Sequence, residues 1–233
     1  MNQPEAERTT GTWAQLLRVV GSDLSRVARQ RRTAVVGAVQ LLPVVGAILL
    51  LQFFSTDGLT TYTSLVENVV FPLLLPAVAI VFGGPLLVSE IERQTVTYLT
   101  ARPVGKRTLF TGKWLASSAL STALGVLPLV GLFLVCLVIP GQLAGSGVVF
   151  GRTLLAAVAG VVTYTAIFAA ISALFATNLV ASVVYYTVVE LGLGLIPTVE
   201  IFTVRFHLQN VAGLSEGSPT VLTGLFPDSG FTL

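Results

Sequence analysis

Ser89-Glu-Ile-Glu-Arg-Gln-Thr-Val-Thr-Tyr-Leu-Thr-Ala-Arg-Pro-Val-Gly-Lys-Arg-Thr-Leu-Phe-Thr-Gly-Lys113 is a polar segment in an otherwise apolar chain. It contains five of the 13 Lys and Arg residues and two of the 11 acidic residues. Each such side chain costs at least ~2.5 kcal/mol at the centre of a bilayer. This segment, residues 89–113, is therefore predicted to lie outside the bilayer, between two membrane-spanning helices.

The composition around this segment indicates an integral membrane protein. Hydrophobic residues make up 54% of the 233 residues, charged residues make up 10%, and the mean hydropathy is +0.87. Soluble domains have about 25% charged residues. The single cysteine, Cys136, excludes an internal disulfide and a cysteine-based zinc site. Residues 1–32 lack the apolar core of a cleavable signal peptide, so the first span is predicted to act as its own signal.

Apolar stretches of membrane-spanning length predict an all-α, polytopic helical membrane protein with five spans. Residues 1–32 would form a cytoplasmic tail with an amphipathic helix, and residues 33–233 the membrane domain. The predicted spans lie at about 33–54, 69–88, 114–139, 153–176 and 179–197, followed by an extracytoplasmic tail at 198–233. The second span should be irregular because it contains Pro72, Pro76 and Pro85.

The distribution of basic residues predicts the orientation. Residues 1–32 and segment 89–113 together carry eleven Lys and Arg residues. The connections on the opposite side carry two, Arg152 and Arg205. The positive-inside rule therefore places the N-terminus and segment 89–113 in the cytoplasm, which predicts a multi-pass protein of the cytoplasmic (inner) membrane.

The N-terminal residues predict a helix that lies in the lipid headgroup plane. Its apolar side chains recur at helical spacing, and three arginines adjoin the first span. The alternative is an amphipathic helix packed on a partner. The predicted membrane-interface residues are Trp13, Leu16, Leu17, Val20, Arg29, Arg31 and Arg32; Leu24 and Val27 continue the apolar stripe.

A short helix is predicted inside segment 89–113. Thr95 is suited to begin it, and Pro103 must end it because the residue before a proline is disfavoured in α conformation. The two turns of 95–102 would present an apolar side and an Arg/Tyr side, which fits a groove on a soluble protein. An ordinary positively charged loop is the alternative.

The segment also resembles the cytoplasmic signature of ABC-2-type transporter permeases, which has the form E-x-x-x-G-T, a leucine-rich turn, R-P-V, a basic residue and G-K. The matching residues are Glu90-Ile-Glu-Arg-Gln-Thr95, Val-Thr-Tyr-Leu99, Arg102-Pro103-Val104, Lys106-Arg107 and Gly112-Lys113. Gln94 stands where the family often has Gly, and six spans are usual in the family. Phe206-His207-Leu208-Gln209-Asn210 resembles an outer-face stretch that follows span five in these permeases.

The resemblance implies that Thr95–Arg102 is a coupling helix seated on a separate ATP-binding cassette ATPase subunit. The N-terminal helix would be the elbow helix. Two permease chains, identical or homologous, would work with two ATPase subunits as an ATP-driven exporter, and the partner would bind ATP and Mg²⁺. The residues implied in ATPase coupling are Glu90, Glu92, Arg93, Thr95, Val96, Tyr98, Leu99, Arg102, Pro103 and Val104.

Small residues in two spans suit the close helix contacts of such a transporter. Ser117, Ser121 and Gly125 recur every fourth residue in the third span, and alanines recur in the same way at 166, 169, 170 and 173 in the fourth. Ordinary span composition is the alternative explanation.

Catalytic and nucleotide-binding motifs are not found, so the chain is not predicted to be an enzyme and is predicted to bind no cofactor or metal itself. Glu190 is the ionisable residue within a predicted span, so it is a candidate for the translocation pathway. Alternatively it hydrogen-bonds across helices or lies near the outer surface. Two other functions remain open, a secondary transporter and a non-transporting membrane anchor or regulatory subunit that recruits a cytoplasmic partner.

Overall fold

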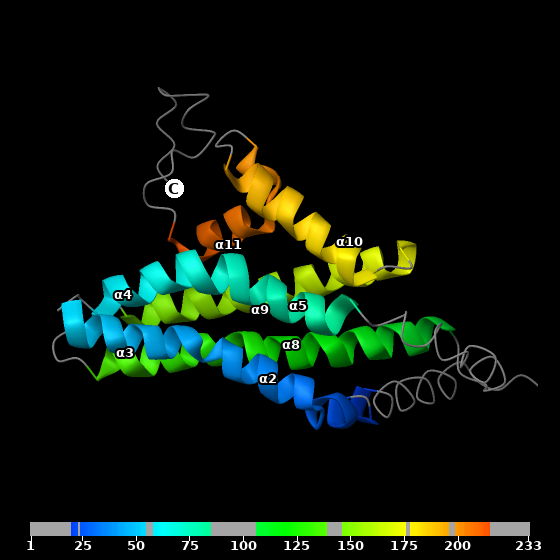
Figure 1. Ribbon diagram of the computed structural model, residues 1–233, viewed down its shortest axis with the longest axis horizontal. Helices are drawn as coiled ribbons and strands as arrows, with labels where there is room; N and C mark the ends of the chain where they lie inside the picture. The colour runs from blue at the N-terminus through cyan, green and yellow to red at the C-terminus, as the bar shows by residue number, and fades with distance from the viewer. Residues whose placement is uncertain are drawn as a thin grey trace, which may run out of the picture.

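The computed structural model describes residues 20–22, 24–54, 58–84, 106–138, 146–175, 178–195 and 199–214. Within these ranges the chain is helical and contains no strand (Figure 1). Four helices are long and apolar enough to cross a membrane: Arg31–Phe53, Gly58–Gly83, Phe110–Leu137 and Ser146–Leu174. A shorter apolar helix, Leu179–Gly192, follows. The four long helices are called spans 1 to 4, and the shorter helix is called span 5 because it lies where the fifth span was predicted, at 179–197, although it is below membrane-spanning length. The chain is an all-α, polytopic membrane protein.

Several spans consist of more than one helical element. Span 1 comprises α2 (Arg31–Gln40) and α3 (Leu42–Phe54), and span 2 comprises α4 (Gly58–Leu65), the π-helix η1 (Val66–Leu74) and α5 (Leu75–Gly83). Spans 3 and 4 are α8 (Lys106–Leu137) and α9 (Ser146–Leu174). Span 5 comprises α10 (Asn178–Tyr185), the π-helix η3 (Tyr186–Gly192) and the 3₁₀-helix η4 (Leu193–Leu195). A 3₁₀-turn, η5 (Glu200–Phe202), and α11 (Val204–Ala212) complete the described chain.

Span 2 begins at Gly58, eleven residues before the predicted start at 69. The sequence Gly58-Leu-Thr-Thr-Tyr-Thr-Ser-Leu65 looks too polar for a span, but its hydroxyl groups find partners inside the protein. The Thr63 hydroxyl donates to the Leu59 carbonyl at 3.1 Å, and the Tyr62 hydroxyl bonds to the Thr153 hydroxyl at 2.6 Å. Span 4 likewise begins at Ser146 rather than at the predicted residue 153. Residues assigned to loops from their polarity therefore belong to helices.

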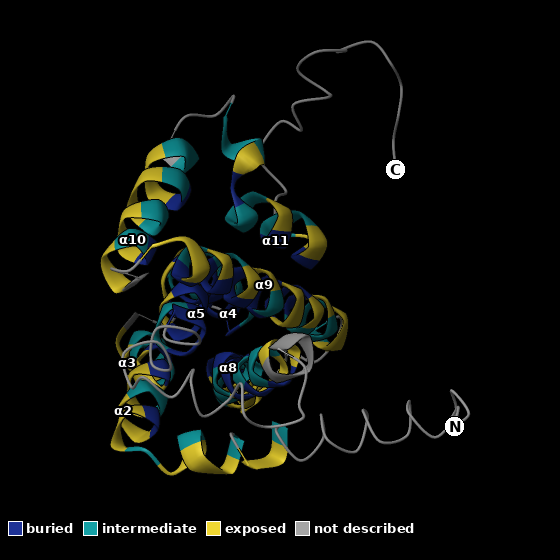
Figure 2. Cartoon of the chain, turned by 90° about the vertical axis from the view of Figure 1, so that its right-hand side faces the viewer, coloured by how far each residue is buried: buried dark blue, intermediate teal, exposed yellow. Residues whose placement is uncertain are grey.

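Spans 2, 3 and 4 form the core of the bundle, and span 1 lies at its edge. Burial inside the protein covers 56% of the apolar window of span 2 but only 17% of that of span 1. Figure 2 shows buried residues concentrated along the faces where α5, α8 and α9 meet, while α2 and α3 are largely exposed. The fully buried side chains at this junction include Phe71, Leu75, Leu129, Val161 and Tyr164.

The small residues of span 3 make the close contacts that were predicted for them. The Ser117 hydroxyl donates to the Phe82 carbonyl at 2.7 Å, and Ser121 is fully buried. A Cβ atom on Gly125 would lie 3.0 Å from side chains of both span 2 and span 4. The alanines of span 4 behave differently, because only Ala169 is buried, whereas those at 166, 170 and 173 are exposed.

Pro72 lies inside η1 and Pro76 in the first turn of α5, so span 2 is irregular as expected. The irregularity is a π-helical stretch, in which the N–H of Leu75 donates to the carbonyl of Val70, five residues earlier. Such π-helical turns are rare and occur frequently at functional sites.

The chain turns back after span 5, and α11 packs on α9 on the same side as α10 (Figures 1 and 2). Leu208 of α11 is buried against Gly160, which lies midway along α9. The stretch 204–212, predicted to belong to an extracytoplasmic tail, is therefore a packed helix. The tail prediction was made from the lack of a long apolar run, and α11, with nine residues, is too short to cross a membrane but packs on α9 and η1.

We predict that a larger side chain at position 160 displaces α11. A Cβ atom there would lie 2.6 Å from the nearest carbon of Leu208, whereas nothing lies within 4 Å of a Cβ atom at Gly151 on the same helix. Overpacking of this kind costs about 1–3 kcal/mol. Gly160→Leu should lower the melting temperature of the purified protein by several degrees relative to Gly151→Leu. Equal melting temperatures would contradict the packing described here.

Candidate functional site

The predicted coupling residues, Glu90 to Val104, lie outside the described residues, as do Trp13, Leu16 and Leu17. Their roles stay predictions. The two elements that flank the segment are described. The end of α5 is tied to α8 by the Ser117–Phe82 hydrogen bond, and Gly83 lies against α9, where a Cβ atom would be 3.2 Å from Cα of Thr165. Residues 106–113 of the segment are the first two turns of α8, and residues 85–105 connect two helices that are joined at a closely packed three-helix junction.

The described part of the N-terminal helix, 20–28 without residue 23, packs on this same end of the bundle. Leu24 and Val27 contact the cluster formed by Val78, Phe82 and Leu120. Part of the apolar stripe predicted from the sequence therefore packs against spans 2 and 3 of the same chain.

Arginines lie on the solvent side of this region. Arg29 and Arg31 are exposed, Val20 is half-buried, and the guanidinium carbon of Arg32 lies 5.5 Å from the centre of the Phe82 ring. Contact of an arginine with an aromatic face in this geometry is a cation–π interaction. We call this end of the bundle the basic end, and the end that holds Gly58 and Ser146 the far end.

Glu190 is a structural partner of α11. Its side chain is 3% exposed and lies in η3. Oε1 accepts the N–H of Val204 at 3.0 Å, and Oε2 accepts the N–H of Arg205 at 3.3 Å. The next N–H, that of Phe206, is accepted by the Thr203 hydroxyl at 3.3 Å. A carboxylate from span 5 therefore satisfies N–H groups that a helix start leaves without intrahelical partners.

Arg152 of α9 lies at the other end of α11. The helix ends at Gly213, which has a φ of 68°, and Leu214 donates its N–H to the Gln209 carbonyl at 3.0 Å. A Cβ atom on Gly213 would be 2.9 Å from the Arg152 guanidinium. A carboxylate near the N-terminus and a guanidinium near the C-terminus both stabilise the helix macrodipole. Spans 5 and 4 thus supply opposite charges to the two ends of α11.

Glu67 of span 2 is a third side chain that meets α11. Its carboxylate accepts a hydrogen bond from the Gln209 side chain at 3.4 Å. Nine residues separate Glu67 from the start of span 2, which places it about 14 Å along the helix. The sequence reasoning missed this residue because it assigned 55–68 to a loop. The sequence signal that could have identified Glu67 is a single acidic residue directly before a long apolar run.

Tyr186 and Gln40 bind backbone carbonyls of span 2. The Tyr186 hydroxyl, at the start of η3, donates to the carbonyl of Pro72. The Gln40 side chain of span 1 is 1% exposed and donates to the carbonyl of Leu74 at 3.1 Å. Neither of these two bonds was predicted from the sequence. Both bonds end on the irregular part of span 2, so spans 1 and 5 stabilise it from two sides.

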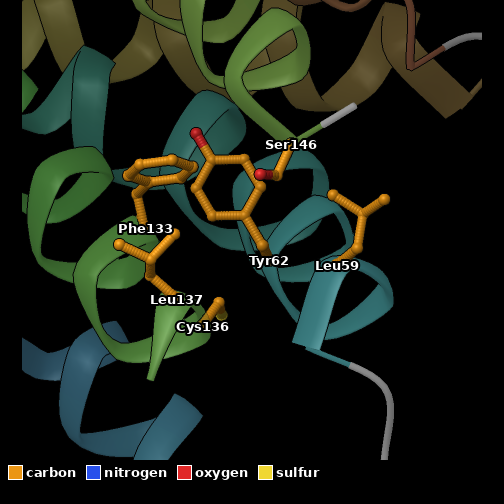
Figure 3. A pocket seen from close by; sticks show the side chains of 6 residues that line it. All are labelled: Leu59, Tyr62, Phe133, Cys136, Leu137 and Ser146. Carbon is orange, nitrogen blue, oxygen red and sulfur yellow. The ribbon is translucent and has the colours of Figure 1, made fainter. Parts of the chain in front are cut away.

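A small apolar pocket at the far end lies apart from these contacts (Figure 3). The ring centres of Tyr62 and Phe133 are 6.3 Å apart in an edge-to-face arrangement. The side chains that line the pocket are Leu59, Tyr62, Phe133, Cys136, Leu137 and Ser146. The Tyr62 hydroxyl is already bonded to Thr153, so the lining offers an apolar surface.

Residues 17–209 match the family of ABC-2 family transporter proteins. The chain belongs to the ABC-2 transporter family. The match covers most of the 233 residues and extends from the N-terminal helix through spans 1 to 5 into α11. A search among curated proteins found no match. Members of this family are the membrane permeases of ABC transporters, so the resemblance noted at Glu90–Lys113 is confirmed at the level of the family.

We predict that Glu190→Gln weakens the attachment of α11. Glutamine retains one acceptor oxygen but turns an amide NH₂ toward one of the two backbone N–H groups. Hydrogen bonds to charged groups contribute about 1.5–3 kcal/mol each. The variant should therefore unfold at a lower temperature than the parent protein in detergent.

Glu200→Gln is the matched control, because Glu200 is a partly exposed acid just before α11 whose carbonyl, rather than its carboxylate, accepts the Thr203 hydroxyl. The control should leave the melting temperature within about one degree of the parent. A Glu190→Gln protein as stable as the control would show that the carboxylate does not hold α11.

Proposed function

We propose that the chain is a membrane-spanning permease subunit that forms the translocation pathway of an ABC transporter and is driven by a separate ATPase subunit. The family match carries this proposal. Two chains, identical or homologous, would assemble with two ATPase subunits, which would bind ATP and Mg²⁺. The resemblance of segment 89–113 to the family signature supports export as the direction. The protein would lie in the inner membrane, with its basic end on the cytoplasmic side.

The geometry of the basic end supports the coupling role. Segment 89–113 joins span 2 to span 3, and these spans are tied together where the described part of span 2 ends. A force applied to the segment would act on the end of α5, on α8 and, through Gly83 and Thr165, on α9. Because close-packed helices transmit rigid-body displacement, movement of an ATPase could reorient all three core spans together.

The electrostatics of the same end support the orientation. Arg29, Arg31 and Arg32 lie next to the start of span 1, where anionic headgroups of the cytoplasmic leaflet attract basic side chains by about 1 kcal/mol each. At the far end, the basic residue of the described spans is Arg152, and it lies against Gly213 of α11. The basic side chains next to the spans are therefore concentrated at the basic end.

We predict that a change of two residues in segment 89–113 detaches the ATPase. Leu99→Asp with Arg102→Glu removes the apolar and basic groups of the expected coupling helix and adds two carboxylates. The double variant should insert into the membrane at the parent level but lose the ATPase subunit during affinity purification. The control is Ser215→Asp with Thr220→Glu, which adds two carboxylates after α11. Full ATPase recovery with the Leu99/Arg102 variant would contradict the docking role.

We also predict the sidedness of the segment. In a chain whose native thiol is removed by Cys136→Ala, a Tyr98→Cys thiol should resist a membrane-impermeant maleimide in intact cells and react after the membrane is opened. A thiol introduced by Phe202→Cys, on a 71% exposed side chain after span 5, should react in intact cells. Reaction of the thiol at 98 in intact cells would reverse the orientation and remove the docking role.

A further inference from the structure

Span 2 contains a backbone carbonyl that its own helix cannot satisfy in the α-helical register. Pro76 has no N–H, so the carbonyl four residues earlier, that of Pro72, lacks its usual donor. The Tyr186 hydroxyl of span 5 donates to this carbonyl. Because an unsatisfied backbone group in hydrocarbon costs several kcal/mol, this bond is expected to persist when neighbouring apolar contacts change.

The two partners of this bond both lie in π-helices. Pro72 lies in η1, and Tyr186 is the first residue of η3. A π-helical turn that reverts to the α-helical register shifts the following helix by one residue, about 1.5 Å and about 100° of rotation. The π-helix of each span therefore lies at the contact between the spans, and a change of its register would move the helix on one side of it relative to the helix on the other side.

Other contacts between spans 2 and 5 are slight. The helix α10 packs mainly on α9 and only lightly on α5. Figure 1 shows α10 inclined away from the bundle, with α11 filling the space beside α9. The hydrogen bond from Tyr186 is thus a directional contact between the two spans, since it fixes a hydroxyl on one carbonyl.

Glu190 lies four residues after Tyr186, one turn along the same helix, and holds the N-terminus of α11 by two bonds to its buried carboxylate. The contact of α11 with span 4 is apolar along the helix, where Leu208 packs on Gly160, and it becomes polar only at the C-terminal end, where Arg152 lies beside Gly213. In a membrane, apolar surfaces separate at little cost because lipid tails replace the lost contacts. Movement of span 5 is therefore expected to carry α11 with it and to open the contact between α11 and span 4.

We propose that Tyr186 is the positioning residue that couples span 2 to the position of span 5 and α11. Movement of span 2, which continues into segment 89–113, shifts η3 through the Pro72 carbonyl, and Glu190 transmits the shift to α11. The contact between Leu208 and Gly160 then opens or closes. This inference rests on the proposed function, because the movement of span 2 originates in the ATPase.

The test uses two disulfide reporters in the Cys136→Ala chain, assembled with its ATPase subunit in lipid nanodiscs. Gly160→Cys with Leu208→Cys reports on the contact between α11 and span 4, since the Leu208 Cγ lies 3.3 Å from a Cβ atom at 160. Gly194→Cys with Thr203→Cys reports on the unit of span 5 and α11, since the Thr203 Cγ2 lies 4.0 Å from a Cβ atom at 194. Cross-linking rates are compared without nucleotide and after trapping with ADP and vanadate.

Trapping should change the rate of the 160–208 cross-link severalfold and leave the 194–203 rate unchanged. Tyr186→Phe should remove the response of the 160–208 pair while the ATPase still associates and hydrolyses ATP. A response that persists in Tyr186→Phe would overturn the proposal, as would an unresponsive 160–208 pair in the parent complex with the ATPase bound. An ATPase that never associates would refute the proposed function, and this inference with it.

A second variant separates coupling from stability. Pro76→Ala returns an N–H to span 2 and thus supplies a donor for the Pro72 carbonyl. Tyr186→Phe alone should lower the melting temperature, and Tyr186→Phe with Pro76→Ala should recover it. The nucleotide response of the 160–208 cross-link should stay absent in the double variant, because the link to span 5 is still missing. Recovery of both properties would reduce Tyr186 to a structural role and overturn the proposal.

Discussion

Backbone N–H and C=O groups must find partners wherever water is absent, and this constraint explains how the outer helices of the protein are arranged. Pro76 leaves the Pro72 carbonyl of span 2 short of a donor, and the start of α11 leaves N–H groups short of acceptors. A single turn of span 5 supplies both partners, the Tyr186 hydroxyl and the Glu190 carboxylate. These two bonds join span 5 to span 2 and to α11, and the packing of α10 on α9 joins it to span 4.

The same constraint distinguishes contacts that persist from contacts that can part. Polar bonds from Glu190 and Tyr186 end on backbone groups that have few alternative partners in hydrocarbon. The packing of Leu208 on Gly160 has no such penalty, because lipid replaces it. Charged residues at both ends of α11 further fix its direction. The outer part of the molecule can therefore be viewed as a helix anchored on span 5 and resting on span 4.

The basic end and the helix α11 are joined by span 2. At the basic end this span is bonded to span 3 through Ser117 and packed on span 4 through Gly83. In its middle it is π-helical and is bonded to spans 1 and 5 through Gln40 and Tyr186. In the proposed mechanism, force applied at segment 89–113 has to reach the opposite half of the pathway, and span 2 would provide the connection through these bonds.

The order of the spans and the basic end could be predicted from the sequence, because long apolar runs and the distribution of Lys and Arg report directly on the cost of placing groups in lipid. The family could be predicted from the motif at Glu90–Lys113. The first third of span 2 could not be predicted, because the hydroxyl groups of Tyr62 and Thr63 form hydrogen bonds inside the protein that composition does not show. Glu67 was missed for the same reason, and Glu190 was found without its partner. The sequence by itself determined where the long apolar helices lie, apart from the first residues of spans 2 and 4, because the cost of entering lipid depends on each side chain separately. Only the tertiary structure decided that α11 folds back on span 4 and that Glu190 and Tyr186 bind backbone groups, because those partners are distant in the chain and become neighbours only when the helices pack.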